Sequence, residues 1–182
     1  SSYTKLTLKE AISKITFGGK GVIITGSSSY KAEEAPPPFA VCWAKVAVDI
    51  RTGSIHLKHI IEAVDVGKAI NPELVEGQVQ GGISMGVGYA MMEQIQIDKK
   101  TKKVLSSDLL HYGVPLALDM PEIHVYIADG HEPTGPFGAK SVGELSTVPV
   151  AAAIAIAISN ATGEEINRIP ITHSYYPKGF NI

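Results

Sequence analysis

The sequence has only one cysteine, Cys42, among its 182 residues. One thiol cannot form a disulfide within the chain, and it cannot build a cluster of thiolate metal ligands. Because structural disulfides belong to oxidising compartments, a chain with a single cysteine is expected in the cytoplasm. Cys42 lies in an apolar, strand-like segment, which predicts an inert buried thiol and not a nucleophile.

The chain also lacks a block of basic residues and a long hydrophobic run. Its formal net charge is -2, which leaves no electrostatic footprint for nucleic acid. The short run from Lys99 to Lys103 lies between two strand-like segments and is interpreted as a solvated hairpin tip. The apolar stretch from Ala151 to Ile158 is too short to cross a bilayer. We therefore expect neither nucleic acid nor a membrane as a partner.

Familiar patterns for nucleophile, phosphate and metal sites are missing as well. The sequence has no serine elbow and no Walker-type loop, and none of its six histidines has a metal-binding spacing. His56 and His59 are three residues apart in a predicted strand, so we expect them to point to opposite faces of the sheet. The prediction is that no side chain of this chain binds a metal.

What the sequence does contain is a mixture of strand and helix patterns. Strand patterns occur in four segments: Val22–Thr25, Phe39–Ile50, Ser54–Val64 and Ile123–Ala128. Helix patterns occur in three: Thr7–Ile15 with a capping box at Thr7 and Glu10, a glycine-rich segment after Asn71-Pro72, and an Ala- and Ile-rich segment that Ser146 or Thr147 caps and Gly163 ends.

These patterns predict an α+β fold, in which a mixed β-sheet packs with the glycine-rich helix and the buried Ala/Ile-rich helix. The second helix has no polar face, which predicts burial on nearly all sides. We expect a single domain over residues 1–182, with the N-terminal helix and a proline-rich connection in residues 1–38 and the core in residues 39–182.

The glycine-rich helix has glycine at positions 77, 81, 82, 86 and 88. Each glycine costs about 1 kcal/mol of helix propensity relative to alanine. Close packing is the expected compensation, because a face without side chains lets another backbone or a ligand approach. Packing of the helix on a sheet without any ligand explains the glycines equally well.

The segment Gly135–Glu144 is a second glycine-rich stretch, and the Ala/Ile-rich helix follows it. A loop that leads into a helix can offer backbone N–H groups to an anion. Glu144 has two possible roles there, because it can favour the helix dipole or transfer a proton. Lys140 can equally form an ordinary salt bridge.

Three motifs in this order resemble the molybdenum hydroxylases, the xanthine dehydrogenase/aldehyde oxidase family. They are Asp65–Pro72, Glu76–Gly82 and Gly135–Glu144, the last followed by the Val148–Ile154 run. The resemblance extends from about Phe39 to about Thr172, and it is to the C-terminal part of the molybdopterin-binding large subunit.

The resemblance implies roles for eight residues. Gln78 corresponds to the glutamine that hydrogen-bonds the molybdopterin, and Glu144 to the active-site glutamate, the general base. The loop that lies against the cofactor corresponds to Gly138, Ala139, Lys140, Ser141, Val142 and Gly143. The implied reaction is hydroxylation of an electron-poor carbon of a purine, an N-heterocycle or an aldehyde, with water as the oxygen source. The implied cofactor is molybdenum–molybdopterin, with or without a dinucleotide extension.

The sequence departs from the family pattern at several points. Met85 stands where many members have a second glutamine, and Ser141 replaces a common glycine or alanine. Upstream substrate-binding segments and an iron–sulfur cysteine set are absent from the sequence. We therefore expect a fragment or one piece of a split subunit, inactive alone. The expected partners are the rest of the large subunit, iron–sulfur and FAD-carrying subunits, and a small-molecule substrate.

Two alternatives remain beside the molybdenum hydroxylase interpretation. The first is a non-catalytic structural or assembly domain of the same fold that has no cofactor in isolation. The second is a nucleotide-phosphate module, which the absence of a strand–GxGxxG–helix pattern disfavours.

Overall fold

A computed structural model describes residues 5–18, 25–29, 31 and 34–171 of the chain. Two compact units are present, Ser1–Glu33 and Glu34–Ile182. The first contains helix α1 (Leu8–Phe17), in which the predicted capping box is confirmed: Glu10 N donates to Thr7 Oγ1 at 3.3 Å, and Thr7 N donates to Glu10 Oε2 at 2.9 Å. The strand predicted at residues 22–25 lies outside the described residues, apart from Thr25.

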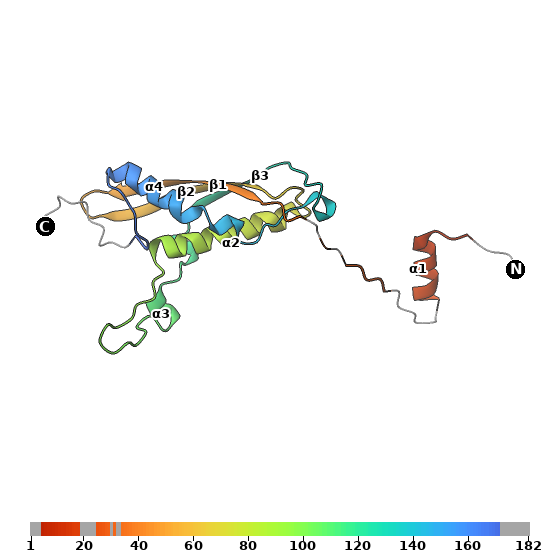
Figure 1. The fold of residues 1–182 in the computed structure, drawn as a ribbon, viewed down its shortest axis with the longest axis horizontal. Coiled ribbons are helices and arrows are strands. Elements are labelled where there is room, and N and C mark those ends of the chain that lie inside the picture. Colours follow the sequence, from red (N-terminus) through yellow and green to blue (C-terminus); the bar gives the residue numbers. More distant parts are fainter. Residues whose placement is uncertain (1–4, 19–24, 30, 32–33, 172–182) are drawn as a thin grey trace. The chain divides into compact units, whose positions relative to one another are not determined.

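The second unit is built on a three-stranded sheet in the order β1-β2-β3 (Figure 1). Strands β1 (Phe39–Asp49) and β2 (Ser54–Asp65), both predicted from the sequence, form an antiparallel hairpin. Strand β3 (Glu122–Ile127) runs parallel to β2, and the two are joined by the long connection containing α2 that a parallel pair requires. The sheet is therefore mixed, as predicted.

One extra residue, Lys58, interrupts the pairing of β2 with β1. Side chains alternate between the two faces of a strand, and a bulge resets that alternation. His56 and His59, which pair with Ala47 and Lys45 of β1, therefore lie on the same face of the sheet. The prediction that the two histidines point to opposite faces is wrong, because it assumed regular alternation through Lys58.

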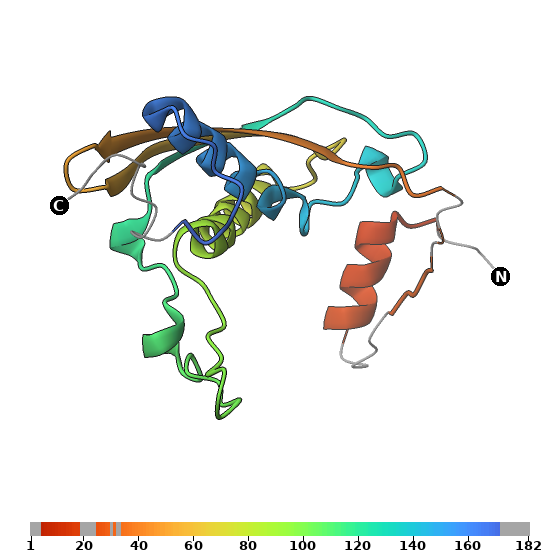
Figure 2. The ribbon, with the colours of Figure 1, turned by 60° about the vertical axis from the view of Figure 1, so that its left-hand side comes forward.

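Helices α2 (Pro72–Met91) and α4 (Val150–Thr162) both pack on one face of the sheet (Figure 2). The start of α2 is as predicted, since Asn71 Oδ1 accepts a hydrogen bond from Leu74 N at 3.2 Å and Pro72 is the first helical residue. The core lies between the helices and the sheet, and its most deeply buried side chains include Ile60, Val64, Val79, Ile83, Val150 and Ile154. This arrangement confirms the α+β fold.

Helix α4 begins later than predicted. A separate 3₁₀ turn, η3 (Leu145–Thr147), contains both residues that were expected to cap the helix, and α4 starts at Val150. Neither Ser146 nor Thr147 is its cap, because Pro149 occupies that position without a side-chain hydrogen bond. The end of α4 is as predicted, at Gly163 with φ of 75°.

Helix α4 packs against the core with one of its sides, although its residues are apolar all round. Ile154 and Ile158 are buried, whereas Ile156 is 60% exposed, so the expected burial on nearly all sides is wrong. Within the described residues, the stretch Leu145–Thr162 has the length and composition of a membrane span. Its inward-facing residues pack on the sheet, and this packing accounts for their hydrophobicity.

The connection between α2 and β3 includes an irregular excursion. Ile97 and Val104 form a single antiparallel bridge, which confirms that the lysine run between them is a hairpin tip. His111 belongs to a short helix, α3 (Leu109–Tyr112), which Asp108 caps by accepting a hydrogen bond from His111 N at 3.0 Å. Two 3₁₀ turns complete the unit, η1 (Ala117–Asp119) and η2 (Pro136–Gly138).

The glycines of α2 form two kinds of surface. A Cβ atom at Gly82 would collide with Ser146, and one at Gly86 would collide with Val150, so this face packs closely against η3 and the start of α4. A Cβ atom at Gly77 or Gly81 would meet nothing within 4 Å. The close packing explains only part of the glycine content, and the face with Gly77 and Gly81 is open.

Substitution of these glycines by alanine should separate the two surfaces. We expect Gly82→Ala to destabilise the chain by more than about 1 kcal/mol, because the added methyl group displaces buried Ser146. Gly81→Ala is the matched control, and it should stabilise the chain by up to about 1 kcal/mol through helix propensity. Urea unfolding followed by circular dichroism measures both changes. Equal effects of the two substitutions would contradict the distinction.

Candidate functional site

The glycine-rich loop between η2 and η3 is held to the sheet at its first residues. Gly138 O accepts hydrogen bonds from Lys68 N at 2.6 Å and from Glu132 N at 2.9 Å, and Lys140 N donates to Val66 O at 2.7 Å. Gly138 is buried and has φ of 84°, a value that L residues rarely adopt. The beginning of the loop is thus fixed against the segment that follows β2.

The side chain of Lys140 reinforces this attachment. Its Nζ lies 2.7 Å from Asp65 Oδ2, donates to Pro37 O at 3.4 Å, and lies 5.1 Å from the centre of the Phe39 ring. The hydrogen bond from Lys140, and then that from Gly67 N, lowers the pKa of Asp65. The ammonium group therefore forms the ordinary salt bridge that was one of its two expected roles.

The end of the loop is held by Gln78 of α2. Its Nε2 donates to Gly143 O at 2.9 Å across 65 positions of the sequence. The completely buried Ser146 donates to Gln78 O at 3.5 Å, which joins η3 to the same turn of α2. Gln78 and the loop, which the sequence motifs linked only by order, are thus in direct contact.

Between these two attachments the backbone donors of the loop are free. Among the described residues, no hydrogen bond is made by the N–H groups of Ser141, Val142, Gly143 and Glu144. Ser141, Gly143 and Glu144 are exposed, so their N–H groups are open to solvent or to a ligand. Such a segment can bind an anion or a ligand rich in hydrogen-bond acceptors.

Glu144 lies at the end of these donors, on the surface. Its side chain is exposed and makes no hydrogen bond or ion pair with the residues that the structure describes. It was expected at the start of the Ala/Ile-rich helix, and this is wrong, because η3 separates it from the first residue of α4, Val150. A contribution to the dipole of α4 is therefore excluded, since that effect falls off within one turn.

A cavity of about 310 Å³ adjoins the loop. Its polar wall comes from Lys68, Asn71 and Gln78, and its apolar wall includes Ala139 and Val142 of the loop. Apolar walls with a few polar groups are typical of small-molecule sites, and this volume lies near the lower end of their range.

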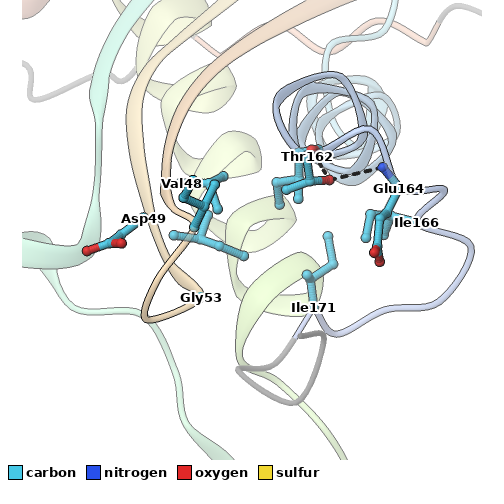
Figure 3. Close-up of a pocket in the computed structure, with 10 residues that line it drawn as sticks. Val48, Asp49, Gly53, Thr162, Glu164, Ile166 and Ile171 are labelled. Atoms are coloured by element: carbon cyan, nitrogen blue, oxygen red, sulfur yellow. Dashed lines mark hydrogen bonds between the residues drawn. The ribbon is translucent and has the colours of Figure 1, made fainter. Parts of the chain in front are cut away.

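A second cavity lies at the opposite end of the sheet, beside the β1–β2 turn (Figure 3). Val48, Gly53, Thr162 and Ile171 line it, and Thr162 Oγ1 accepts a hydrogen bond from Glu164 N at 3.3 Å. Its volume of about 20 Å³ suffices for roughly one water molecule. This cavity is too small for a cofactor and is remote in sequence from the glycine-rich loop.

Sequence reasoning missed one buried acid, Glu62 of β2. Its side chain is completely buried on the core face, and neither carboxyl oxygen has a hydrogen-bond partner within the described part of the chain. Desolvation raises the pKa of Glu62 to about 8. Strand alternation was the available signal, since it places Glu62 on the same face as Ile60 and Val64.

Cys42 faces Glu62 across the hairpin. Desolvation, and secondarily the charge of Glu62, raises the pKa of the thiol to about 12. A thiol with so high a pKa is a poor nucleophile, which agrees with the inert role predicted from the sequence.

Comparisons with known proteins bear on the loop and on α2. A family model described as a molybdopterin cofactor-binding domain matches residues 2–121, a range that includes Gln78 and ends before the loop. The xanthine dehydrogenase molybdenum-binding subunit of Escherichia coli is 38% identical over 153 residues, which are 84% of this chain and 20% of that protein. An aldehyde oxidoreductase molybdenum-binding subunit of Escherichia coli is 33% identical over 174 residues, 87% of this chain and 24% of that protein.

Solved structures agree with these matches. The aldehyde oxidoreductase of Desulfovibrio gigas superposes with a TM-score of 0.68 at 32% identity, covering 76% of this chain and 15% of that one. Quinoline 2-oxidoreductase of Pseudomonas putida superposes with a TM-score of 0.67 at 30% identity, covering 71% and 17%. The chain spans about a fifth of the length of the curated relatives that it matches.

Proposed function

Since the chain belongs to the molybdopterin cofactor-binding domain family, within the molybdenum hydroxylase large subunits, we propose that it forms one wall of a molybdopterin site in which Glu144 is the general base. The observation that carries the proposal is the span of free N–H groups from Ser141 to Glu144, held between two attachments. The relatives are named as molybdenum-binding subunits of oxidoreductases, and we propose the same class of activity for the enzyme to which this chain belongs.

The residues present fit a molybdopterin group. A pterin with its phosphate is rich in hydrogen-bond acceptors, and the loop offers four unpaired donors to such a group. The open glycine face at Gly77 and Gly81 leaves room for a planar ligand beside Gln78. We assign the cofactor contacts to Gln78 and to the loop residues Gly138, Ala139, Lys140, Ser141, Val142 and Gly143. Of these loop residues, Ser141, Val142 and Gly143 have N–H groups without a partner among the described residues.

When bound, a molybdenum–molybdopterin group supplies two-electron redox chemistry. The chain itself contributes positioning and proton transfer. Gln78 fixes the end of the loop, and Glu144 accepts a proton at its carboxylate, which has no competing partner among the described residues. We propose hydroxylation of an electron-poor carbon, in a purine, an N-heterocycle or an aldehyde, as the reaction of the complete cytoplasmic enzyme.

The other parts of the site come from outside the chain in this proposal. The chain spans about a fifth of its relatives, and those relatives are named as subunits of larger enzymes. We therefore infer that the remaining large-subunit segments, and the iron–sulfur and FAD groups, are its partners, and that the cofactor has either the simple or the dinucleotide form.

The contact of Gln78 with the loop can be tested by cofactor content. In the full-length protein we expect Gln78→Ala to lower bound molybdenum and pterin several-fold, because the loop end loses its hydrogen bond and the cofactor loses a donor. Gln80→Ala is the matched control, since Gln80 lies on the same helix and its side chain, among the described residues, donates only to Glu76 Oε1, at 3.2 Å. Metal analysis by mass spectrometry measures the change. Unchanged content in the Gln78 variant would reject its assignment and favour a non-catalytic assembly domain.

A further inference from the structure

Three potential metal ligands meet on the exposed face of the sheet, away from the glycine-rich loop. His59 lies in β2, and Glu122 and His124 lie in β3. His59 Nδ1 is 3.1 Å from Glu122 Oε2, and His124 Nε2 is 3.1 Å from Glu122 Oε1. One ligand atom from each residue lies within 4.8 Å of the other two. We propose that these three residues form a binding site for a late first-row divalent cation, Zn²⁺ in particular.

The strand geometry brings the three side chains together. His59 and Glu122 are directly paired in the parallel register of β2 and β3, and His124 is two residues beyond Glu122 on the same face. The bulge at Lys58 lies just before this pairing, which runs from His59 to Val64 of β2. The two imidazole rings are stacked at 19°, with centroids 6.4 Å apart.

The spacing and chemistry of the ligands suit Zn²⁺. Tetrahedral zinc, with bonds of about 2.0–2.1 Å to nitrogen and oxygen, requires neighbouring ligand atoms roughly 3.3 Å apart. The two nitrogen–oxygen distances of 3.1 Å involve different oxygens of Glu122 and are each close to that value, and one ligand atom from each of the three residues lies within 4.8 Å of the others. Two imidazoles and one carboxylate form a common set of three protein ligands for zinc, which leaves the fourth position to water or another group.

The charged residues near the three ligands show which interactions a bound metal would replace. Lys45 of β1 pairs with His59 on the same face and is the cation next to the site along that row. Without a metal, the two carboxylate oxygens of Glu122 can accept hydrogen bonds from the two imidazole rings. Exposed pairs of that kind contribute little to stability, about 0–1 kcal/mol, so removing them has a small effect on folding.

Titration of the purified 182-residue chain with ZnCl₂ in a calorimeter tests the site. We expect a stoichiometry of about one, and an affinity that falls at least tenfold in His124→Asn and in Glu122→Gln. His56→Asn is the matched control, because His56 is on the same face but contacts Ser54 Oγ at 3.3 Å. Circular dichroism of each variant establishes that it is folded. No binding to the wild-type chain, or equal binding by the His56 and His124 variants, overturns the proposal.

A second measurement reports where the metal binds. The single tryptophan, Trp43, pairs with Ile61 of β2, and Ile61 pairs with His124 of β3. Two strand spacings separate Trp43 from His124, about 10 Å. Cu²⁺ at the site should therefore quench Trp43 fluorescence in the wild-type chain and in His56→Asn, and much less in His124→Asn. Quenching that is independent of His124 contradicts the location.

Discussion

In the full-length enzyme, replacement of Glu144 by glutamine is expected to lower turnover at least about 100-fold while molybdenum content remains at the wild-type level. Glutamine keeps the size of the side chain and cannot accept a proton as a carboxylate does. Binding of the cofactor should persist, because the carboxylate supports no hydrogen bond of the described fold and the free donors of the loop belong to the backbone.

Glu165→Gln provides the control for Glu144→Gln. Glu165 is also exposed and lies beyond α4, outside both glycine-rich motifs. Steady-state turnover and metal analysis on the same preparations separate loss of chemistry from loss of cofactor. Near-normal turnover in Glu144→Gln would remove Glu144 from the mechanism, and a parallel loss of molybdenum would make it a structural residue.

Much of the fold could be predicted from local patterns. Asn71-Pro72 marks the start of α2, Gly163 marks the end of α4, and alternating residues mark each strand, because these signals act within a few residues of each other. The family resemblance assigned Gln78 and the loop to one cofactor site, but it did not predict the hydrogen bond between them. A contact across 65 positions leaves no periodic trace in the sequence.

Other features could not be predicted because tertiary packing decides them. The bulge at Lys58 places His56 on the same face as His59, and no residue type at that position requires a bulge. Ser146 of the 3₁₀ turn before α4 packs against Gly82, which belongs to another helix. The metal-ligand cluster likewise depends on the pairing of β2 with β3, so spacing along the chain could not indicate it.

The second large expected effect is a dependence of the free energy of unfolding on pH, which arises from Glu62. Burial raises the pKa of this carboxyl from 4.5 to about 8, so between these values the folded chain holds a proton that the unfolded chain has released. The stability that protonated Glu62 contributes is therefore complete below pH 4.5. It is lost progressively as the pH rises from 4.5 through 8. We expect the free energy of unfolding to fall from pH 5 to pH 8, with a total contribution of roughly 5 kcal/mol from this group.

Two substitutions distinguish the effect of the charge of Glu62 on stability from the effect of its carboxyl oxygens that lack hydrogen-bond partners. Glu62→Gln removes the titration and should flatten this part of the pH dependence. Glu62→Leu should do the same and also stabilise the chain at pH 8 by several kcal/mol, because it removes a buried group without hydrogen-bond partners. Urea unfolding at four pH values between 5 and 8 measures both effects. A curve for Glu62→Gln that runs parallel to that of the wild type would contradict the assignment.

The attachment of the glycine-rich loop at both ends has an entropic consequence. Ordering a free backbone costs about 1–2 kcal/mol per residue, and a ligand that had to order residues 141–144 itself would lose that amount from its affinity. Here the contacts of Gly138 and Lys140 at one end, and of Gln78 at the other, impose the order when the chain folds. The donors are therefore preorganised. Most of the conformational entropy of residues 141–144 is lost when the chain folds, before a ligand binds.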